Sequence, residues 1–287
     1  MPLALITGAS TGIGEATALR LARGGWTVLA GVRNAQAAEA LRESAREITA
    51  GGVIPLTLDV TSEEQIAQAA ERVRAETGAA GDGAGRLDAL VNNAGVGYGG
   101  PLELVTVDEL RKQFDVNVVG AIAVTQALLP ALRGARGRIV FTSSIGGKVS
   151  TPFIAPYSAS KHALEAIGDS LRVELATSNV RVALVEPGSV ATPIWDKSRA
   201  EAQRVQIPEQ LSEFYGKVPA AMGKAIEDTA RRGIPPDEVA KVIERALTEP
   251  RMKARYLVGR DARVQLLMRR VLPDLMFDRI ISRILGL

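Results

Sequence analysis

A tyrosine and a lysine stand four residues apart in the stretch YSASK, residues 157–161. Both side chains have ordinary pKa values near 10, so neither is an obvious acid or base at neutral pH. A spacing of four places the two groups on one face of a helix, within reach of each other or of a shared ligand. The pair could exchange a proton with a substrate, or it could simply belong to an amphipathic helix start. The rest of the sequence must decide between these interpretations.

A glycine-rich segment, TGASTGIG at residues 7–14, follows an apolar run and leads into a helical pattern. Its glycines permit a tight turn and close backbone approach, and free N–H groups at the start of a helix can bind a pyrophosphate. The spacing is G-x-x-x-G-x-G and no G-K-S/T follows, which disfavours a phosphate-binding loop of the kinase or ATPase type. Taken alone, the segment could also be a generic strand-to-helix turn.

The elements that must position these groups alternate along the chain between short apolar runs and longer helical patterns. The pattern predicts strands at residues 3–7, 27–32, 53–58, 89–92, 138–143, 180–186 and 255–258. It predicts helices at 12–24, 35–49, 62–77, 106–132, 157–176 and 236–248. Parallel strands are joined through helices that cover both faces of a sheet, so we predict a doubly wound α/β fold with a mostly parallel sheet. No linker divides the chain, and we expect one domain over residues 1–287.

Two regions depart from this alternation. Residues 189–234 carry scattered proline and aromatic residues without a clear strand, which suits an insertion over a site. Its aromatic side chains could pack a lid or line an apolar substrate pocket; they are Trp195, Phe214 and Tyr215. Residues 262–287 form a basic, apolar extension in which apolar residues recur with helical spacing after Pro273. That helix could pack on the insertion, on a second subunit or on an anionic membrane surface.

The composition excludes several classes of function. The 287 residues are 46% hydrophobic and 23% charged, which is typical of a soluble globular protein. A net charge of +3 without an aromatic-studded basic patch argues against nucleic-acid binding. With no cysteine and only His162, neither thiol catalysis nor a zinc site is available, and we predict no metal. The N-terminus has no signal-peptide pattern and no apolar run reaches about 18 residues, so we expect a cytoplasmic protein.

Several motifs, taken together and in order, resemble those of the short-chain dehydrogenase/reductase family. They are TGASTGIG (7–14), LDV (58–60), NNAG (92–95), Asn117, Ser144, the Tyr157-x-x-x-Lys161 pair and Pro187-Gly188. The resemblance implies a single Rossmann-type domain that interconverts a hydrophobic secondary alcohol and its ketone or aldehyde, as members acting on steroids or retinoids do. It also implies a homodimer or homotetramer that pairs through residues 106–132 and 157–176. A nucleotide-sensing regulator on the same fold stays open as an alternative, as does an epimerase or dehydratase.

The resemblance assigns catalytic roles to four residues. Tyr157 would be the general acid in carbonyl reduction and the base in alcohol oxidation. Lys161 would lower the pKa of Tyr157 and hold the nicotinamide ribose. Ser144 would hydrogen-bond the substrate oxygen, with Ser143 as a competing candidate. Asn117, expected in the middle of a helix, would position a water molecule that links Lys161 to solvent.

The same resemblance implies the residues that bind the cofactor. They are Gly8, Ser10, Gly12, Ile13, Gly14, Arg33, Asp59, Val60, Asn93, Ala94, Gly95, Tyr157, Lys161, Pro187, Gly188, Val190 and Thr192. Asp59 would contact the adenine or merely cap a turn, and the last two residues would fix the nicotinamide carboxamide.

The end of the second strand bears on the choice of cofactor. An acidic residue there would hold the adenosine ribose and repel a 2′-phosphate, which selects NAD. The strand ends instead with Arg33, whose guanidinium suits a phosphate. We therefore predict that NADP(H) is preferred and that NAD(H) is also accepted, since the neutral Thr11 stands where other NADP users carry a second basic residue.

Overall fold

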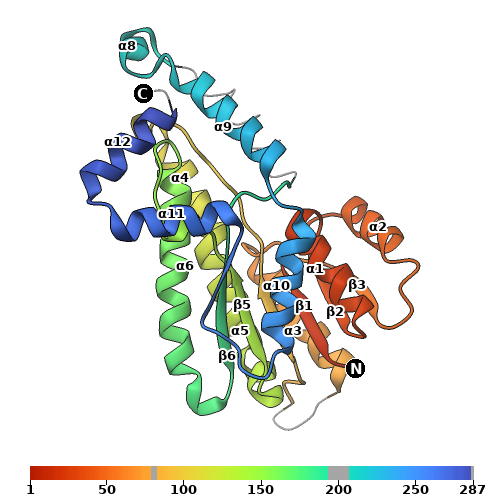
Figure 1. Cartoon of the computed structure of the whole chain (residues 1–287). Helices are drawn as coiled ribbons and strands as arrows, with labels where there is room; N and C mark the ends of the chain where they lie inside the picture. The colour runs from red at the N-terminus through yellow and green to blue at the C-terminus, as the bar shows by residue number, and fades with distance from the viewer. Residues whose placement is uncertain (79–82, 193–206, 286–287) are drawn as a thin grey trace.

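The computed structural model describes residues 1–78, 83–192 and 207–285 (Figure 1). Within them lies one parallel sheet with the strand order β3-β2-β1-β4-β5-β6-β7. The strands are β1 (Leu3–Ile6), β2 (Thr27–Val32), β3 (Gly52–Thr57), β4 (Ala89–Asn92), β5 (Arg138–Thr142), β6 (Arg181–Pro187) and β7 (Arg255–Val258). The predicted doubly wound α/β Rossmann fold is confirmed, and each predicted strand ends within one residue of the observed bounds.

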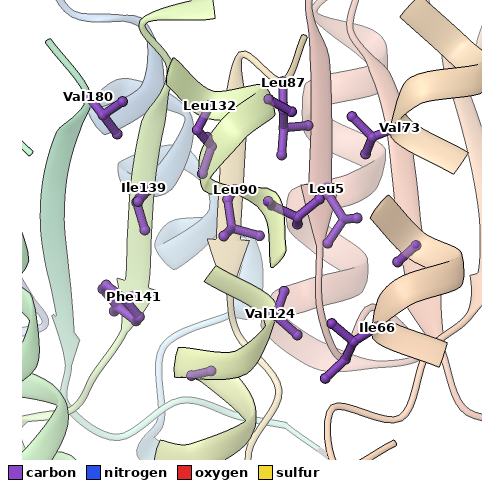
Figure 2. Packing of buried hydrophobic residues seen from close by; sticks show 14 of the residues in the cluster. Leu5, Ile66, Val73, Leu87, Leu90, Val124, Leu132, Ile139, Phe141 and Val180 are labelled. Carbon is purple, nitrogen blue, oxygen red and sulfur yellow. The ribbon is translucent and has the colours of Figure 1, made fainter. Parts of the chain in front are cut away.

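Helices cover both faces of the sheet because successive strand residues point to opposite sides. On one side, Leu5 and Leu90 pack against α3 (Glu63–Thr77), α5 (Gly120–Ala135) and α6 (Ala155–Glu174). Figure 2 shows this cluster of buried side chains between strands and helices. On the other side, Ile6 and Val28 pack against α1 (Gly12–Arg23), α2 (Ala35–Ser44) and α10 (Pro236–Thr248). Because both faces of the sheet are buried, the strands are unbroken apolar runs in the sequence.

One long helical stretch combines α4 (Val107–Phe114), a π-helical turn (Asp115–Val119) and α5. It covers the predicted helix 106–132, and by length and composition alone it could cross a membrane. Val124, Leu128 and Leu132 from this stretch are instead buried against the sheet. Its apolar character is therefore that of a core helix.

One local prediction is wrong in detail. The helix predicted at 35–49 ends at Ser44, because the chain must pass close to α1 before β3 begins. A Cβ atom on Gly51 would lie 2.3 Å from the carbonyl oxygen of Trp26, so only glycine fits this approach. Ser62 is the N-cap residue of α3. Ser62 accepts the Gln65 N–H, but the Gln65 side chain accepts the backbone N–H of Asp59 at 2.7 Å.

The two irregular regions of the sequence contain helices. In the predicted insertion lie α8 (Ser212–Tyr215) and α9 (Val218–Arg232), while residues 193–206, including Trp195, lie outside the described residues. The C-terminal extension forms α11 (Arg260–Val271) and α12 (Asp274–Leu285), and α12 begins directly after Pro273. In Figure 1, α8, α9 and α12 lie at the same end of the molecule.

Candidate active site

A cleft of about 440 Å³ lies at the carboxyl ends of the strands, where the strand order reverses between β1 and β4. Open parallel sheets bind their ligands at this position. The predicted site residues that line the cleft are Gly8, Ser10, Gly12, Ile13, Arg33, Asp59, Val60, Asn93, Ala94, Gly95, Ser144, Tyr157, Lys161, Pro187, Gly188, Val190 and Thr192. Of the predicted site residues, only Gly14 and Asn117 do not line it.

The glycine-rich turn between β1 and α1 has a conformation that requires glycine. Gly8 and Gly12 have φ angles of +66° and +63°, and a Cβ atom on Gly8 would lie 2.8 Å from the Cα atom of Ala94. A Cβ atom on Gly14 would lie 2.2 Å from the Gly8 carbonyl oxygen, so Gly14 acts by packing α1 onto the turn. The N-cap residue Thr11 makes no side-chain cap, which leaves the first N–H groups of α1 for a ligand. This turn therefore fits the pyrophosphate of a dinucleotide.

Asn93 and Thr7 hold the glycine-rich turn against the segment after β4. The Asn93 amide donates hydrogen bonds to the carbonyl oxygens of Thr7 and Gly8, at 3.1 and 3.0 Å. The Thr7 hydroxyl accepts the backbone N–H groups of Asn93 and Ala94, each at 3.0 Å. The Asn93 side chain thus connects the turn after β1 to the segment after β4, as expected for an asparagine of this motif.

Arg33 and Asp59 lie at the end of the cleft formed by β2 and β3. Arg33 is exposed, and its charge helps to lower the pKa of Asp59. The larger cause of that lowered pKa is Thr61, whose hydroxyl and backbone N–H both donate to the Asp59 carboxylate, at 2.7 and 2.9 Å. Asp59 therefore caps its own turn, as one of the two interpretations of the sequence allowed. Arg33 brings an exposed guanidinium group to this end of the cleft.

Ser144, Tyr157 and Lys161 come together at the opposite end of the cleft. Tyr157 is partly buried and hydrogen-bonded to Ser144, and the Lys161 Nζ lies 5.7 Å from the centroid of the Tyr157 ring. Lys161 is buried and donates to the carbonyl oxygen of Thr142 at 2.8 Å. The competing Ser143 is also buried, but its hydroxyl lies toward Gly147, where a Cβ atom would be 3.0 Å away. The geometry thus favours Ser144 as the partner of Tyr157.

The pKa values of this pair correct one expectation. Burial raises the pKa of Tyr157, against the opposing effect of the Ser144 hydrogen bond. Burial also lowers the pKa of Lys161 to about 8, although the charge of Glu165 acts in the other direction. The expected lowering of the Tyr157 pKa by Lys161 is not observed, since the pKa of Tyr157 is raised. The Lys161 ammonium group donates to the carbonyl oxygen of Thr142, and burial disfavours its charged form. The phenol is held protonated, which is the form a general acid needs.

Asn117 lies in the π-helical turn and not in a regular helix. Its Oδ1 accepts the backbone N–H of Val96 at 2.8 Å. Its Nδ2 donates to the Val96 carbonyl oxygen and to the Ser160 hydroxyl, each at 3.0 Å. The buried amide therefore joins the segment after β4 to α6, the helix that carries Tyr157 and Lys161, and single π-turns often occur at functional sites. Its role in positioning a water molecule stays a prediction.

A buried ionic cluster lies behind Lys161. Glu165, one turn along α6, accepts from Lys148 at 2.7 Å and from Arg255 at 2.9 Å. Arg255 also lies 3.2 Å from Glu186 on β6, whose pKa is raised to about 7 by burial and by the charge of Glu165. The cluster fixes α6, and with it Tyr157 and Lys161, to β6 and β7.

Asp261 positions the cleft segment after β6, a contact that the sequence did not reveal. Its Oδ2 accepts the backbone N–H of Ser189 at 2.7 Å, 72 residues away. Its Oδ1 lies so close to Gly188 and Gly259 that a Cβ atom on either would come within 2.4 and 2.5 Å of it. An aspartate in the first turn of a helix is a common capping residue, so only the fold shows that it holds the cleft segment after β6.

Comparison with known proteins gives consistent matches over the whole chain. A family profile described as short chain dehydrogenase matches residues 2–203. The uncharacterized oxidoreductase YusZ of Bacillus subtilis is 37% identical over 285 residues, which are 98% of this chain and 97% of that protein. The NADPH-dependent 3-dehydrocapnine reductase of Ornithobacterium rhinotracheale is 33% identical, over 98% of this chain and 96% of that protein. Retinol dehydrogenase 5 of Mus musculus is 34% identical, over 98% of this chain and 87% of that protein.

Two solved structures agree with the fold. A short-chain dehydrogenase from Streptomyces avermitilis has a TM-score of 0.76 and 30% identity, and the match covers 98% of this chain and 97% of that one. A short-chain dehydrogenase/reductase from Burkholderia phymatum, in complex with NAD, has a TM-score of 0.78 and 26% identity over 94% and 92% of the two chains.

Proposed function

Because this chain belongs to the short chain dehydrogenase family, we propose that it is an NADP(H)-dependent oxidoreductase that interconverts a hydrophobic alcohol and its ketone or aldehyde. The observation that carries the proposal is the meeting of Ser144, Tyr157 and Lys161 at one end of a cleft. The other end holds the exposed Arg33, and the glycine-rich turn lies along the same cleft. These are the groups that a nicotinamide dinucleotide and a carbonyl oxygen require.

The cleft residues suggest a mechanism for carbonyl reduction. Bound NADPH would supply the hydride. Tyr157, which is protonated at neutral pH, would donate its proton to the substrate oxygen while Ser144 donates a hydrogen bond to the same oxygen. Lys161 would hold a ribose hydroxyl, and its positive charge would stabilise the tyrosinate left behind. In alcohol oxidation the same groups would act in the opposite order.

The surroundings of the reacting end favour an apolar substrate. Val96, Tyr98 and Val116 line the cleft, and Ile145 and Val149 follow Ser144 in an apolar cluster. A relative named for retinol, a hydrophobic alcohol, supports the same class.

The direct test is a panel assay. Oxidation of NADPH should be followed by its absorbance with aliphatic, aromatic, steroid and retinoid carbonyl compounds. Turnover of at least one apolar carbonyl is expected. Tight NADPH binding without turnover of any compound would instead favour a nucleotide-sensing protein.

Replacing Arg33 by alanine should change the choice between the two cofactors. A charge-assisted hydrogen bond to a phosphate contributes about 1.5–3 kcal/mol, so we expect the ratio of Kd values for NADH and NADPH to fall on the order of 10- to 100-fold. Calorimetric titration with each cofactor measures this ratio without a known substrate. Arg133→Ala, which removes an exposed arginine from the end of α5, is the matched control. A wild-type protein that prefers NADH, or an unchanged ratio in Arg33→Ala, would show that Arg33 only faces solvent.

Replacing Asp261 by alanine should weaken NADPH binding by about tenfold or more, since the Ser189 N–H loses a charged acceptor and the adjoining cleft segment loosens. The effect should be measured as Kd by calorimetry, with Asp274→Ala as the control. Asp274 is the first-turn aspartate of α12 and pairs with Arg269, far from any cleft residue in sequence. If both variants bind NADPH equally well, Asp261 has no part in shaping the cleft.

We also propose a homodimer or homotetramer that pairs through α4–α5 and α6. Val119 and Val173 support this surface, because they lie on those helices with 54% and 73% of their area exposed. Exposed apolar side chains of this kind are common where subunits meet.

A further inference from the structure

The last two helices expose an unusual number of large apolar side chains. Of the thirteen such residues in the described part of the chain, six lie on α11 and α12, and each is more than half exposed. They are Val264, Leu267, Val271, Leu275, Met276 and Ile284. A concentration of this kind on two helices of twelve residues each marks an interaction surface.

The exposed residues share the outer faces of the two helices. Val264, Leu267 and Val271 are three and four residues apart, which places them on one side of α11. The opposite sides of the two helices pack inward, where Ala262 and Phe277 join an apolar cluster on the segment after Ser144. In Figure 1, α11 and α12 lie on the outside of the molecule.

The same two helices carry the net charge of the protein. Residues 260–287 contain six arginines and three aspartates, a net charge of +3, so the other 29 basic residues are balanced by 29 acidic ones. Among the described residues, only Arg269 of the six forms an ion pair, with Asp274. Arg279 and Arg283 follow Leu275 by four and eight residues and therefore lie on its side of α12. The outer surface is both apolar and positively charged.

We propose that α11 and α12 dock on the surface of an anionic lipid bilayer. The exposed apolar side chains would enter the boundary of the acyl region, and the unpaired arginines would lie at the level of the lipid phosphates. A second copy of this chain fits less well, because a symmetric pair would bring two such positive surfaces together. A nucleic acid would satisfy the arginines but would leave the apolar side chains without an apolar partner.

Docking has a geometric consequence for the cleft. Because the inner sides of the two helices pack on Ile145 and Val149, directly after Ser144, a bound bilayer would lie near the substrate end. That consequence rests on the proposed function, whereas docking itself does not.

Vesicle flotation of the full-length protein tests the docking without any measurement of activity. Wild type should float with vesicles of equimolar phosphatidylglycerol and phosphatidylcholine, and much less with phosphatidylcholine alone. The double variant Arg279→Gln/Arg283→Gln should lose affinity about 30-fold, since each arginine near an anionic surface contributes about fivefold. Leu275→Ser/Ile284→Ser should lose at least about tenfold. Binding should also weaken at high salt.

Matched controls come from exposed residues elsewhere. Arg23→Gln and Leu102→Ser remove an arginine and an apolar side chain that are also exposed and lie outside α4, α5 and α6, and both variants should float like wild type. Unchanged NADPH affinity in every variant verifies folding. A wild type that stays unbound to phosphatidylglycerol vesicles would overturn the proposal, as would equal losses in the controls. If the α12 variants alter the mass measured by light scattering but not flotation, a second copy covers this surface and the proposal is wrong.

Discussion

Replacing Tyr157 by phenylalanine should lower kcat by about 100-fold or more and leave the Kd for NADPH within about twofold of wild type. A positioned acid–base group contributes about 10²–10⁴ in rate, and phenylalanine removes the hydroxyl group while it keeps the ring. The ring would still pack against Gly146, whose added Cβ atom would lie 3.3 Å from it, and under the Lys161 ammonium group. The measurement is kcat with the best carbonyl compound of the panel, beside calorimetric titration with NADPH.

Tyr215→Phe is the matched control for this prediction. The Tyr215 hydroxyl donates to Glu103 on the surface and does not line the cleft, so turnover should be unaffected. A Tyr157→Phe protein with near-normal turnover would remove Tyr157 as the acid. A variant that loses both turnover and NADPH affinity would show that the phenol acts mainly in shaping the site.

The sheet could be predicted from sequence because its strands are buried on both faces. Leu5 and Ile6 point to different cores, so β1 has no polar face to interrupt the apolar run. Helix ends were less predictable where a distant segment decides them. The helical pattern after residue 35 continues beyond Ser44, but close packing of Gly51 on α1 forces the chain out of the helix.

The cleft residues could be predicted where they belong to local motifs at strand ends. Gly8, Arg33 and Ser144 each lie within two residues of the end of a strand, and parallel strands bring their carboxyl ends to one edge. Contacts between distant segments could not be predicted in this way. Asp261 reaches Ser189 only because β7 pairs with β6, and no spacing in the sequence reports that pairing.

The direction of the Tyr157 pKa was also beyond the sequence. The spacing of Tyr157 and Lys161 shows that the two groups are neighbours, but it does not show how deeply either is buried. Burial disfavours the charged form of each, so it raises the pKa of the phenol and lowers the pKa of the lysine. A short sequence motif cannot report this balance.

Replacing Lys161 by methionine should reduce activity and increase stability at the same time. Loss of the charge that stabilises the tyrosinate and of the ribose contact should lower kcat/KM by about 100-fold or more. Burial lowers the pKa of Lys161 from 10.5 to about 8, so its charged form costs the native state about 3 kcal/mol at pH 7. Methionine removes that cost but also the hydrogen bond to Thr142, which contributes about 1.5–3 kcal/mol. A net gain of about 1 kcal/mol should raise Tm by about 2–4 °C.

The pH dependence of that gain identifies its cause. Between pH 8 and about 10 the unfolded chain keeps the Lys161 proton while the native protein releases it. The contribution of Lys161 to the free energy of unfolding of the wild type should therefore rise with pH. Lys161→Met lacks this group, and its Tm advantage should therefore shrink from pH 7 to pH 10. Glu186 titrates near 7, below this window, and is present in both proteins. The exposed control Lys112→Met should follow wild type throughout. A Tm advantage that stays constant with pH would mean that Lys161→Met stabilises the protein through packing. Lys161 would then carry no buried charge that could stabilise the Tyr157 tyrosinate.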